Sequence, residues 1–467
     1  MINLPNDYVE RMKVQLGEEY RVYERSLQET PVRGLRVNTN RISAEKFEQL
    51  FEESIEKLPF SNDGYILKSE NKLGNLPMHL SGLFYLQEPS SMIAVCSSEI
   101  ERENRPLKVL DLCASPGGKT SQIACRISAN SVLFSNEIIK SRADILFSNV
   151  ERQGFENVVV LNEEPKRLSG FEGCFDYIFV DAPCSGEGMF RKTPETISEW
   201  SLANVEMCAE RQKEILEMAE KLLVAGGKLV YSTCTFSELE DERVVEWFLE
   251  NFNYELAEIP EEIKAVTKPV VINGKVEENA RKFYPHVSRG EGQFVAVFKN
   301  LDEERGDKLY SKKHYRAVNL IGRTNRQKVD AFFAETMMHS VDWKRLIEIG
   351  ATVYLAPEGF DAKLQTAIDE LRIVSLGVKI GTIQKDRFEP HHNIFMALSE
   401  NFKQQVELSD DELKRYLHGE ELSRTNLFAG YAVVAKNGYP IGGVKISNGK
   451  LKNLYPKGMR IWWITHL

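Results

Sequence analysis

Two cysteines in this chain each follow an apolar run that is typical of a buried strand. Cys184 ends the run Asp181-Ala182-Pro183-Cys184, and Cys234 ends the run Ser232-Thr233-Cys234. A nearby cation or helix N-terminus lowers the pKa of a thiol and makes it a nucleophile, and Lys119 is a candidate for that cation. A single cysteine at a strand end is more often buried filler. The pair, together with Asp181, favours covalent catalysis by a thiol.

A glycine-containing turn precedes both cysteine motifs in the chain. Residues 108–112 form a short apolar run typical of a central parallel strand, and the glycines after it let the backbone approach a ligand closely. The helix expected next would direct free N–H groups at that ligand. The alternative is a plain strand-to-helix turn. The residues of the candidate loop are Ala114, Ser115, Pro116, Gly117, Gly118 and Lys119.

Glu137 is a candidate for binding a ribose. It stands 26 residues after Asp111 and just past the second expected strand, where a carboxylate typically accepts hydrogen bonds from ribose hydroxyls. Its alternative is an ordinary surface acid. The glycine turn that precedes it favours the binding role.

Strands and helices alternate through the central part of the chain. This alternation predicts a mostly parallel, doubly wound α/β sheet with helices on both faces, and ligands bind beyond the carboxyl ends of its strands. Ser237 and Glu240 have the spacing of a capping box, which predicts that another helix begins there. The strands are expected at residues 108–112, 131–135, 158–161, 177–180, 228–232 and 294–298, and the helices at residues 118–127, 141–153 and 205–223.

The glycine run and the two cysteine runs, in this order, resemble the cofactor loop and the paired cysteine motifs of the Nop/Sun family of S-adenosylmethionine-dependent RNA cytosine-C5 methyltransferases. Residues 85–92, residues 290–294 and the C-terminal modules are similar to the bacterial RsmF-type subgroup, so the resemblance covers nearly the whole chain. DNA cytosine methyltransferases, by contrast, carry their nucleophile in a Pro-Cys motif and lack the second cysteine. The resemblance implies a Rossmann-like methyltransferase domain.

The resemblance also implies a role for each catalytic residue. Cys234 would add to C6 of a cytosine, which makes C5 nucleophilic enough to take a methyl group, and Cys184 would help to release the product. Asp181 would hydrogen-bond the N3 and amino edge of the base, and Lys119 would help orient the site. Such chemistry requires a base that is unstacked or single-stranded.

The cofactor implied by the resemblance is S-adenosylmethionine. The loop 114–119 would hold it, Asp181 would lie against it, and Glu137 would bind its ribose. The family usually has an Asp near the end of the third strand that faces the adenine. This chain has Asn162-Glu163 there, so the resemblance assigns that role to Glu163. No metal is expected.

Composition excludes several classes of protein. The chain has 467 residues, 42% of them hydrophobic, which is typical of a soluble globular protein with more than one domain. No window is apolar enough for a membrane span, and the start shows no secretory signal, so we expect a cytoplasmic protein without a membrane partner. Seven cysteines without a Cys-x-x-Cys pair argue against a disulfide framework and a zinc site.

The charge of the chain is unevenly distributed. The formal net charge is −9, yet residues 305–467 hold 25 Lys and Arg against 18 Asp and Glu. Residues 423–467 contain seven basic residues, no carboxylate, and aromatic residues that include Phe428, Tyr431, Trp462 and Trp463. Basic residues among aromatics suit a surface that binds phosphates and stacks bases. The alternative is a solvated β-rich face whose aromatics form its own core.

We expect four domains. Residues 1–90 are an N-terminal α+β RNA-binding domain, in which Arg33, Arg36, Asn38 and Arg41 form either a basic patch or an ordinary solvated edge. Residues 91–302 are the methyltransferase domain. Residues 303–380 are a small α/β module after a linker near residues 301–307, and residues 381–467 are a β-rich, PUA-like RNA-binding module with turns at Asn437-Gly438, Gly442-Gly443 and Asn448-Gly449.

Three functions compete on the sequence. The subgroup resemblance favours methylation of small-subunit ribosomal RNA, possibly within the subunit, by a monomer, and transfer RNA is the second candidate substrate. A non-catalytic RNA-binding ribosome-assembly factor would use the C-terminal module alone, and the intact Cys184 and Cys234 argue against it. A nicotinamide-dependent oxidoreductase would require Gly-x-Gly-x-x-Gly after the first strand, where this chain has Ser115-Pro116-Gly117-Gly118-Lys119.

Overall fold

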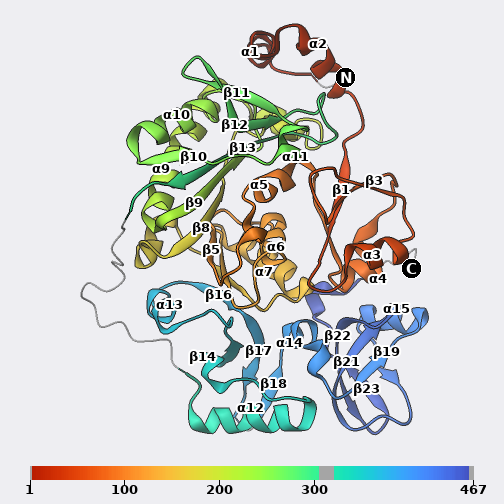
Figure 1. The fold of residues 1–467 in the computed structure, drawn as a ribbon. Coiled ribbons are helices and arrows are strands. Elements are labelled where there is room, and N and C mark those ends of the chain that lie inside the picture. Colours follow the sequence, from red (N-terminus) through yellow and green to blue (C-terminus); the bar gives the residue numbers. More distant parts are fainter. Residues whose placement is uncertain (1–2, 304–319, 386, 462–467) are drawn as a thin grey trace.

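The fold, seen in a computed structural model, is built on four β-sheets (Figure 1). The structure describes residues 3–303, 320–385 and 387–461. Most of the expected linker, as well as Trp462 and Trp463, lies outside these residues. Within them, no helix is long and apolar enough to cross a membrane.

The N-terminal region combines a helical hairpin with a small antiparallel sheet. Helices α1 (Asn6–Leu16) and α2 (Tyr20–Ser26) do not pack on that sheet, and instead bury aromatic side chains against the loops that follow β8 and β9. Helix α3 (Ala44–Leu50) covers the sheet and is capped by Ser43, whose hydroxyl accepts from the backbone N–H of Lys46. The sheet order is β2-β3-β1-β4, with strands β1 (Arg33–Val37), β2 (Ile55–Lys57), β3 (Gly64–Leu67) and β4 (Phe84–Leu86).

The prediction that four residues form a basic patch or a solvated edge on this region is wrong for Arg36 and Asn38. Arg36 and Asn38 are fully buried. The Arg36 guanidinium donates to Gln87 and to Ser121 of the methyltransferase region, at 3.0 and 2.7 Å. A buried guanidinium must be paired to offset its desolvation, so these contacts lock the N-terminal sheet to the central one.

The central sheet confirms the doubly wound α/β architecture. Its order is β11-β12-β13-β9-β8-β5-β6-β7-β16, and the five strands from β9 to β7 run parallel to one another. These strands are β5 (Lys108–Asp111), β6 (Val132–Asn136), β7 (Val158–Leu161), β8 (Phe175–Asp181) and β9 (Leu223–Thr233).

Helices cover both faces of this sheet, as the alternation predicts. One core lies under α5, α6 and α7, and the other under α9, α10 and α13. The helices are α5 (Ile93–Cys96), α6 (Gly118–Ala124), α7 (Lys140–Gln153), α9 (Leu202–Leu222), α10 (Glu242–Asn251) and α13 (Ala362–Ala367).

Both ends of the sheet extend beyond the expected strands. Strand β13 (Gln293–Asn300) was expected to close the sheet, but the antiparallel hairpin of β11 (Lys268–Ile272) and β12 (Lys275–Phe283) continues it. At the other edge, β16 (Ile373–Leu376) pairs antiparallel with β7. A strand from the expected small α/β module therefore completes the methyltransferase sheet.

The expected capping box at Ser237 is wrong. Helix α10 begins at Glu242, after a turn, and the Ser237 hydroxyl has no hydrogen-bond partner within the described part of the chain. Glu240 is fully buried and turned toward Ser185 instead. Its carboxylate accepts hydrogen bonds from Ser185 and Gln212 there, instead of capping the N-terminus of a helix.

The C-terminal region contains two sheets. The first has the order β14-β15-β17-β18 and crosses the expected boundary at residue 380, which lies inside β17. Its strands and helices are β14 (Leu346–Ile349), β15 (Thr352–Leu355), β17 (Val378–Ile383), β18 (Phe388–Pro390), α12 (Arg323–Thr336) and α14 (His392–Ala397).

The last sheet has the order β19-β21-β22-β23-β20. Turns follow β21 and β22 at Asn437-Gly438 and Asn448-Gly449, as expected. The turn expected at Gly442-Gly443 is wrong, because both glycines lie inside β22, where a Cβ would come within 2.6 Å of the Tyr416 hydroxyl or 2.5 Å of the Phe395 ring. The elements are β19 (Gln405–Glu407), α15 (Asp410–His418), β20 (Leu422–Ser423), β21 (Gly430–Lys436), β22 (Tyr439–Ser447) and β23 (Lys450–Asn453).

Candidate active site

A cavity of about 930 Å³ opens at the carboxyl ends of the parallel strands. Its walls come from the segments after β5, β6, β7, β8 and β9 and from one side of α9. Parallel strands bring these segments to one edge of the sheet. The candidate residues on its wall are Ser115, Glu137, Asp181, Cys184 and Cys234.

The glycine turn supports the cavity from behind. Gly117 has φ +110°, which favours glycine, and a Cβ there would lie 3.0 Å from a Leu146 methyl group. Ser115 is the member of the loop that reaches the wall, and its hydroxyl donates to the Arg142 carbonyl at 2.9 Å. Ala114, Pro116, Gly117 and Gly118 form the turn without lining the cavity.

Glu137 presents a buried carboxylate on the cavity wall. Its Oε1 accepts from the backbone N–H of Ile139 at 2.9 Å, and Oε2 lies 3.5 Å from Arg142. Ile138 and Ile139 line the same wall although they are 53% and 49% exposed. A fixed carboxylate beside exposed apolar side chains fits a ribose attached to a flat purine ring.

Glu163 does not reach the cavity. It is fully buried, and its carboxylate binds Arg167 at 3.0 Å and the backbone N–H of Arg372 at 2.7 Å. Arg372 directly precedes β16, so Glu163 ties the C-terminal region to the central sheet. The segment that lines the cavity at this strand end is 164–166.

Asp181 and Lys119 meet at the centre of the site. Lys119 Nζ lies 2.8 Å from Asp181 Oδ2, while Oδ1 accepts from Ser232 at 2.8 Å and from Gln293 at 3.2 Å. Three donors thus hold the carboxylate in place, and its side chain is still 35% exposed. Lys119 itself is buried, and its ammonium faces Asp181.

The two cysteine sulfur atoms are in contact. Asp181 of β8 pairs with Ser232 of β9, so the residues that follow each strand emerge side by side. The Sγ atoms of Cys184 and Cys234 are 3.2 Å apart on the cavity wall. The hydrogen bond with Cys234, followed by burial, raises the pKa of the Cys184 thiol. Cys184 is therefore protonated at neutral pH.

Glu240 ties the two cysteine loops together and was missed as a site residue. Its carboxylate accepts from the backbone N–H of Ser185 at 2.8 Å and lies 3.4 Å from the Thr235 hydroxyl. Ser185 follows Cys184, Thr235 follows Cys234, and their hydroxyl oxygens are 2.9 Å apart. Gln212 of α9 donates to Glu240 at 3.0 Å and to the Pro183 carbonyl at 3.0 Å.

Helix α9 contributes cavity-lining residues that sequence reasoning also missed. Their helical spacing was the available signal, because positions three and four apart share one face. Cys113 lines the cavity too, and burial raises the pKa of its thiol. The lining residues of α9 are Arg211, Glu214, Ile215, Glu217 and Met218.

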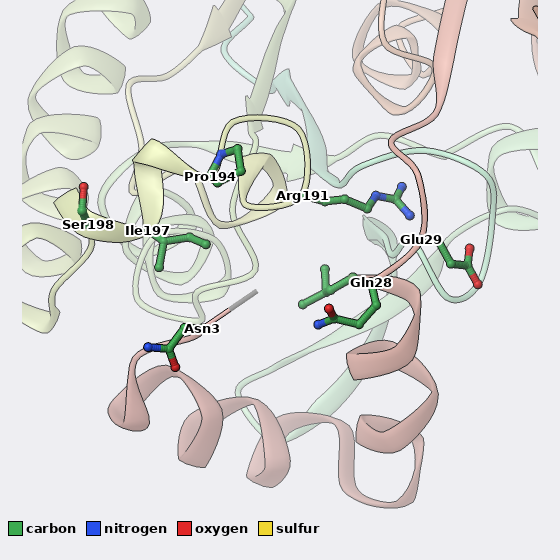
Figure 2. Close-up of a pocket in the computed structure, with 8 residues that line it drawn as sticks. Asn3, Gln28, Glu29, Arg191, Pro194, Ile197 and Ser198 are labelled. Carbon is green, nitrogen blue, oxygen red and sulfur yellow. The ribbon is translucent and has the colours of Figure 1, made fainter. Parts of the chain in front are cut away.

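A second cavity of about 770 Å³ lies between the helical hairpin and the segment 191–198 (Figure 2). None of the expected site residues lines it. Arg191 in its wall is buried and bound by Glu291 at 2.8 and 3.0 Å. Among the described residues, no group of three or more His, Cys, Asp and Glu side chains could hold a metal ion.

We predict that Glu240→Gln flattens the pH dependence of stability. Burial raises the pKa of Glu240 from 4.5 to about 7, so the folded chain holds a proton that the unfolded chain loses between these values. The stabilisation is complete below about pH 4.5 and disappears as pH rises through 7, on the order of 3 kcal/mol for this shift. Denaturant unfolding from acidic to neutral pH measures this slope.

The control is Glu206→Gln, which changes an exposed glutamate on α9. It should keep the wild-type dependence of unfolding free energy on pH. An equally steep dependence in Glu240→Gln would show that the Glu240 proton does not contribute.

Family models match four successive parts of the chain. The model for 16S rRNA methyltransferase RsmB/F matches residues 99–299, and the N-terminal domain of 16S rRNA methyltransferase RsmF matches residues 4–89. The RsmF rRNA methyltransferase first C-terminal domain matches residues 331–398, and the methyltransferase RsmF PUA domain matches residues 403–461.

Relatives match over almost the full length. Ribosomal RNA small subunit methyltransferase F of Enterobacter sp. (strain 638) is 31% identical, over 91% of this chain and 89% of that protein. The protein of the same description from Vibrio campbellii (strain ATCC BAA-1116) is 30% identical, over 98% of this chain and 97% of its own.

The fold also has a solved neighbour. The structure of a methyltransferase homolog protein from Pyrococcus horikoshii is 27% identical and superposes with a TM-score of 0.54, covering 64% of this chain and all of that one. The fold, the four matched family models and the full-length relatives all indicate a methyltransferase. The chain belongs to the 16S rRNA methyltransferase RsmB/F family, whose cofactor is S-adenosylmethionine.

Proposed function

We propose that the chain methylates C5 of a cytosine in small-subunit ribosomal RNA, with Cys234 as the nucleophile. The contact between the Cys184 and Cys234 sulfur atoms on the cavity wall carries the proposal. A methyltransferase that acts on an oxygen or an amine needs no thiol pair, whereas C5 of cytosine becomes nucleophilic only after addition at C6. The names of the relatives support ribosomal RNA as the substrate.

The residues present fit the cofactor. S-adenosylmethionine supplies an electrophilic methyl group on a sulfonium. We assign its ribose to Glu137, its adenine to the wall of Ile138 and Ile139, and its remaining part to the face of Asp181 and to the loop 114–119, which reaches the cavity through Ser115. Glu163 keeps no role in this assignment, because its carboxylate is bound by Arg167 and Arg372.

The two cysteines act at successive steps of the proposed reaction. The Cys234 thiolate forms a bond to C6, and the electron pair of the C5–C6 double bond moves to C5 for methyl transfer. Once the Cys234 sulfur is bonded to carbon, its hydrogen bond with the Cys184 thiol is lost, and this bond is the main cause that raises the pKa of Cys184. Cys184 can then lose its proton to solvent and take the proton from C5. The C5–C6 double bond re-forms as the Cys234 sulfur leaves.

Asp181 is suited to hold the base during these steps. Its fixed carboxylate can accept a hydrogen bond from the cytosine amino group, and the neighbouring Lys119 ammonium compensates its charge. Because both groups are already in place, no reorganisation is needed when charge develops on the ring.

We propose that the regions outside the central sheet bind RNA. The division is an N-terminal domain of residues 1–90, a catalytic domain of residues 91–302, and C-terminal modules of residues 303–380 and 381–467, acting as a monomer. The C-terminal excess of Lys and Arg supports phosphate contacts there.

Bisulfite sequencing of total RNA from cells with and without the gene tests the substrate. We expect a 5-methylcytosine in small-subunit ribosomal RNA that disappears with the gene. If a 5-methylcytosine disappears from transfer RNA instead, ribosomal RNA is not the substrate, but the proposed methylation of cytosine C5 still holds.

We predict opposite outcomes for the two cysteine variants. Cys234→Ala has no nucleophile, so it should give neither methylated RNA nor a covalent protein–RNA adduct, while cofactor binding persists. Cys184→Ala should attack and methylate but release slowly, accumulating an adduct that survives denaturing electrophoresis.

Cys208→Ala, a buried cysteine on α9, serves as the control and should turn over without an accumulated adduct. An adduct with Cys234→Ala and none with Cys184→Ala would move the nucleophile to Cys184.

We predict that Glu137→Ala weakens binding of S-adenosylmethionine by roughly 1–3 kcal/mol, because ribose hydroxyls lose their buried acceptor. Titration calorimetry on the full chain measures it. Asp144→Ala, an exposed acid on α7, is the control. Unchanged affinity in Glu137→Ala would remove Glu137 from the site.

A further inference from the structure

Three lysines share one solvent-facing side of the hairpin β22-β23. Lys445 pairs directly with Lys452 across the two strands, and Ser447 pairs with Lys450. Side chains alternate between the faces of a strand, so Lys450 and Lys452 point to the same side, roughly 7 Å apart. All three are exposed. We call Lys445, Lys450 and Lys452 the lysine face.

The pairing of Lys445 with Lys452 costs stability. Like charges directly opposite each other on neighbouring strands are destabilising. The charge of Lys450 is compensated by Glu421, whose carboxylate lies 3.4 Å from the Lys450 ammonium. Lys445 has its ammonium over the Tyr431 ring, 5.2 Å from the centroid, and no ion pair is recorded for Lys452 among the described residues. The repulsion between Lys445 and Lys452 is relieved when an anion binds to both ammonium groups.

Phe428 is an exposed aromatic side chain in the loop that leads into β21, the strand that pairs with β22. It is 84% exposed. Its backbone is held from both sides by the Gln404 amide, which accepts from the Phe428 N–H at 3.0 Å and donates to its carbonyl at 3.2 Å. An exposed ring on a fixed backbone can stack on a flat partner with little loss of entropy.

The rest of the chain covers only the other half of this sheet face. Tyr431, next to Lys445, packs against Phe332 of α12, and Val433 belongs to the core under α12 and α14. The lysines lie on the neighbouring strands β22 and β23, where their side chains are exposed. In Figure 1 the β21-β22-β23 sheet lies at the outer end of the C-terminal region. The lysine face is thus open to another molecule.

We propose that the lysine face binds a single-stranded segment of the RNA substrate. Its phosphates would lie across Lys445, Lys452 and Lys450, and one base would stack on Phe428. The proposal deepens the proposed function, on which it rests, by assigning the RNA contact to one face of the last module. A single strand is favoured over a duplex because only an unpaired base offers its ring to a protein aromatic.

Lys452→Glu tests the proposal in the full chain. The change replaces a like-charge pair by an opposite-charge pair, so the melting temperature should stay equal or rise. Affinity for small-subunit ribosomal RNA and for a short unstructured RNA oligonucleotide should fall by roughly 10-fold. The slope of log Kd against log salt concentration should decrease by roughly 0.7 for each lost phosphate contact.

Phe428→Ala provides an independent test with a different signature. Loss of one stacked base should weaken binding by roughly 5-fold or more, and the salt slope should stay unchanged because no charge is lost. The control for Lys452→Glu is Lys275→Glu, the same charge change on an exposed residue of β12 at the far edge of the central sheet. It should leave RNA affinity near that of the wild type.

The possible outcomes separate the proposals. Equal RNA affinity in Lys452→Glu and Lys275→Glu would overturn the lysine face. Loss of binding to assembled subunits with unchanged binding to free RNA would also overturn it, and would assign the face to a ribosomal protein. A wild-type chain that binds RNA through this face but methylates no cytosine would keep the face and overturn the proposed chemistry.

Discussion

The site depends on one constraint, that two cysteines fifty residues apart in sequence must bring their sulfur atoms together. The parallel register of β8 and β9 places Asp181 beside Ser232, which aligns the two loops roughly. The buried Glu240 carboxylate then binds the residue after each cysteine. Because a buried carboxylate needs several donors, the two loops cannot separate without leaving it unsatisfied.

The same contacts fix the surroundings of the cysteines. Gln212 links Glu240 to α9, the helix that forms one wall of the cavity. Lys282 of β12 donates to the Phe236 carbonyl at 3.0 Å and to Glu242 at the start of α10. The hairpin added at this edge of the sheet therefore holds the segment that follows Cys234, so the added strands support the catalytic loop as well as the core.

The parallel strands and the glycine and cysteine runs could be predicted from the sequence because each is encoded locally, by apolar periodicity and turn residues. Glu240 was assigned to a capping box because its spacing is local, whereas its real partners, Ser185 and Gln212, are distant in sequence. Glu163 was misplaced for the same reason, since Arg372 lies 209 positions away. The strands β11, β12 and β16 are short or partly exposed, and tertiary pairing decides their state.

Strand β16 gives the catalytic sheet a protected border. Every residue of β7 is buried, and without β16 its backbone would form an unpaired apolar edge. Such edges template association with other chains. A polypeptide that ended before residue 373 would therefore carry all the glycine and cysteine motifs, but β7 would be an unpaired edge strand that favours association with other chains. During synthesis β7 leaves the ribosome long before β16. The nascent chain therefore passes through a stage in which the edge of β7 is unpaired and is a potential binding site for chaperones.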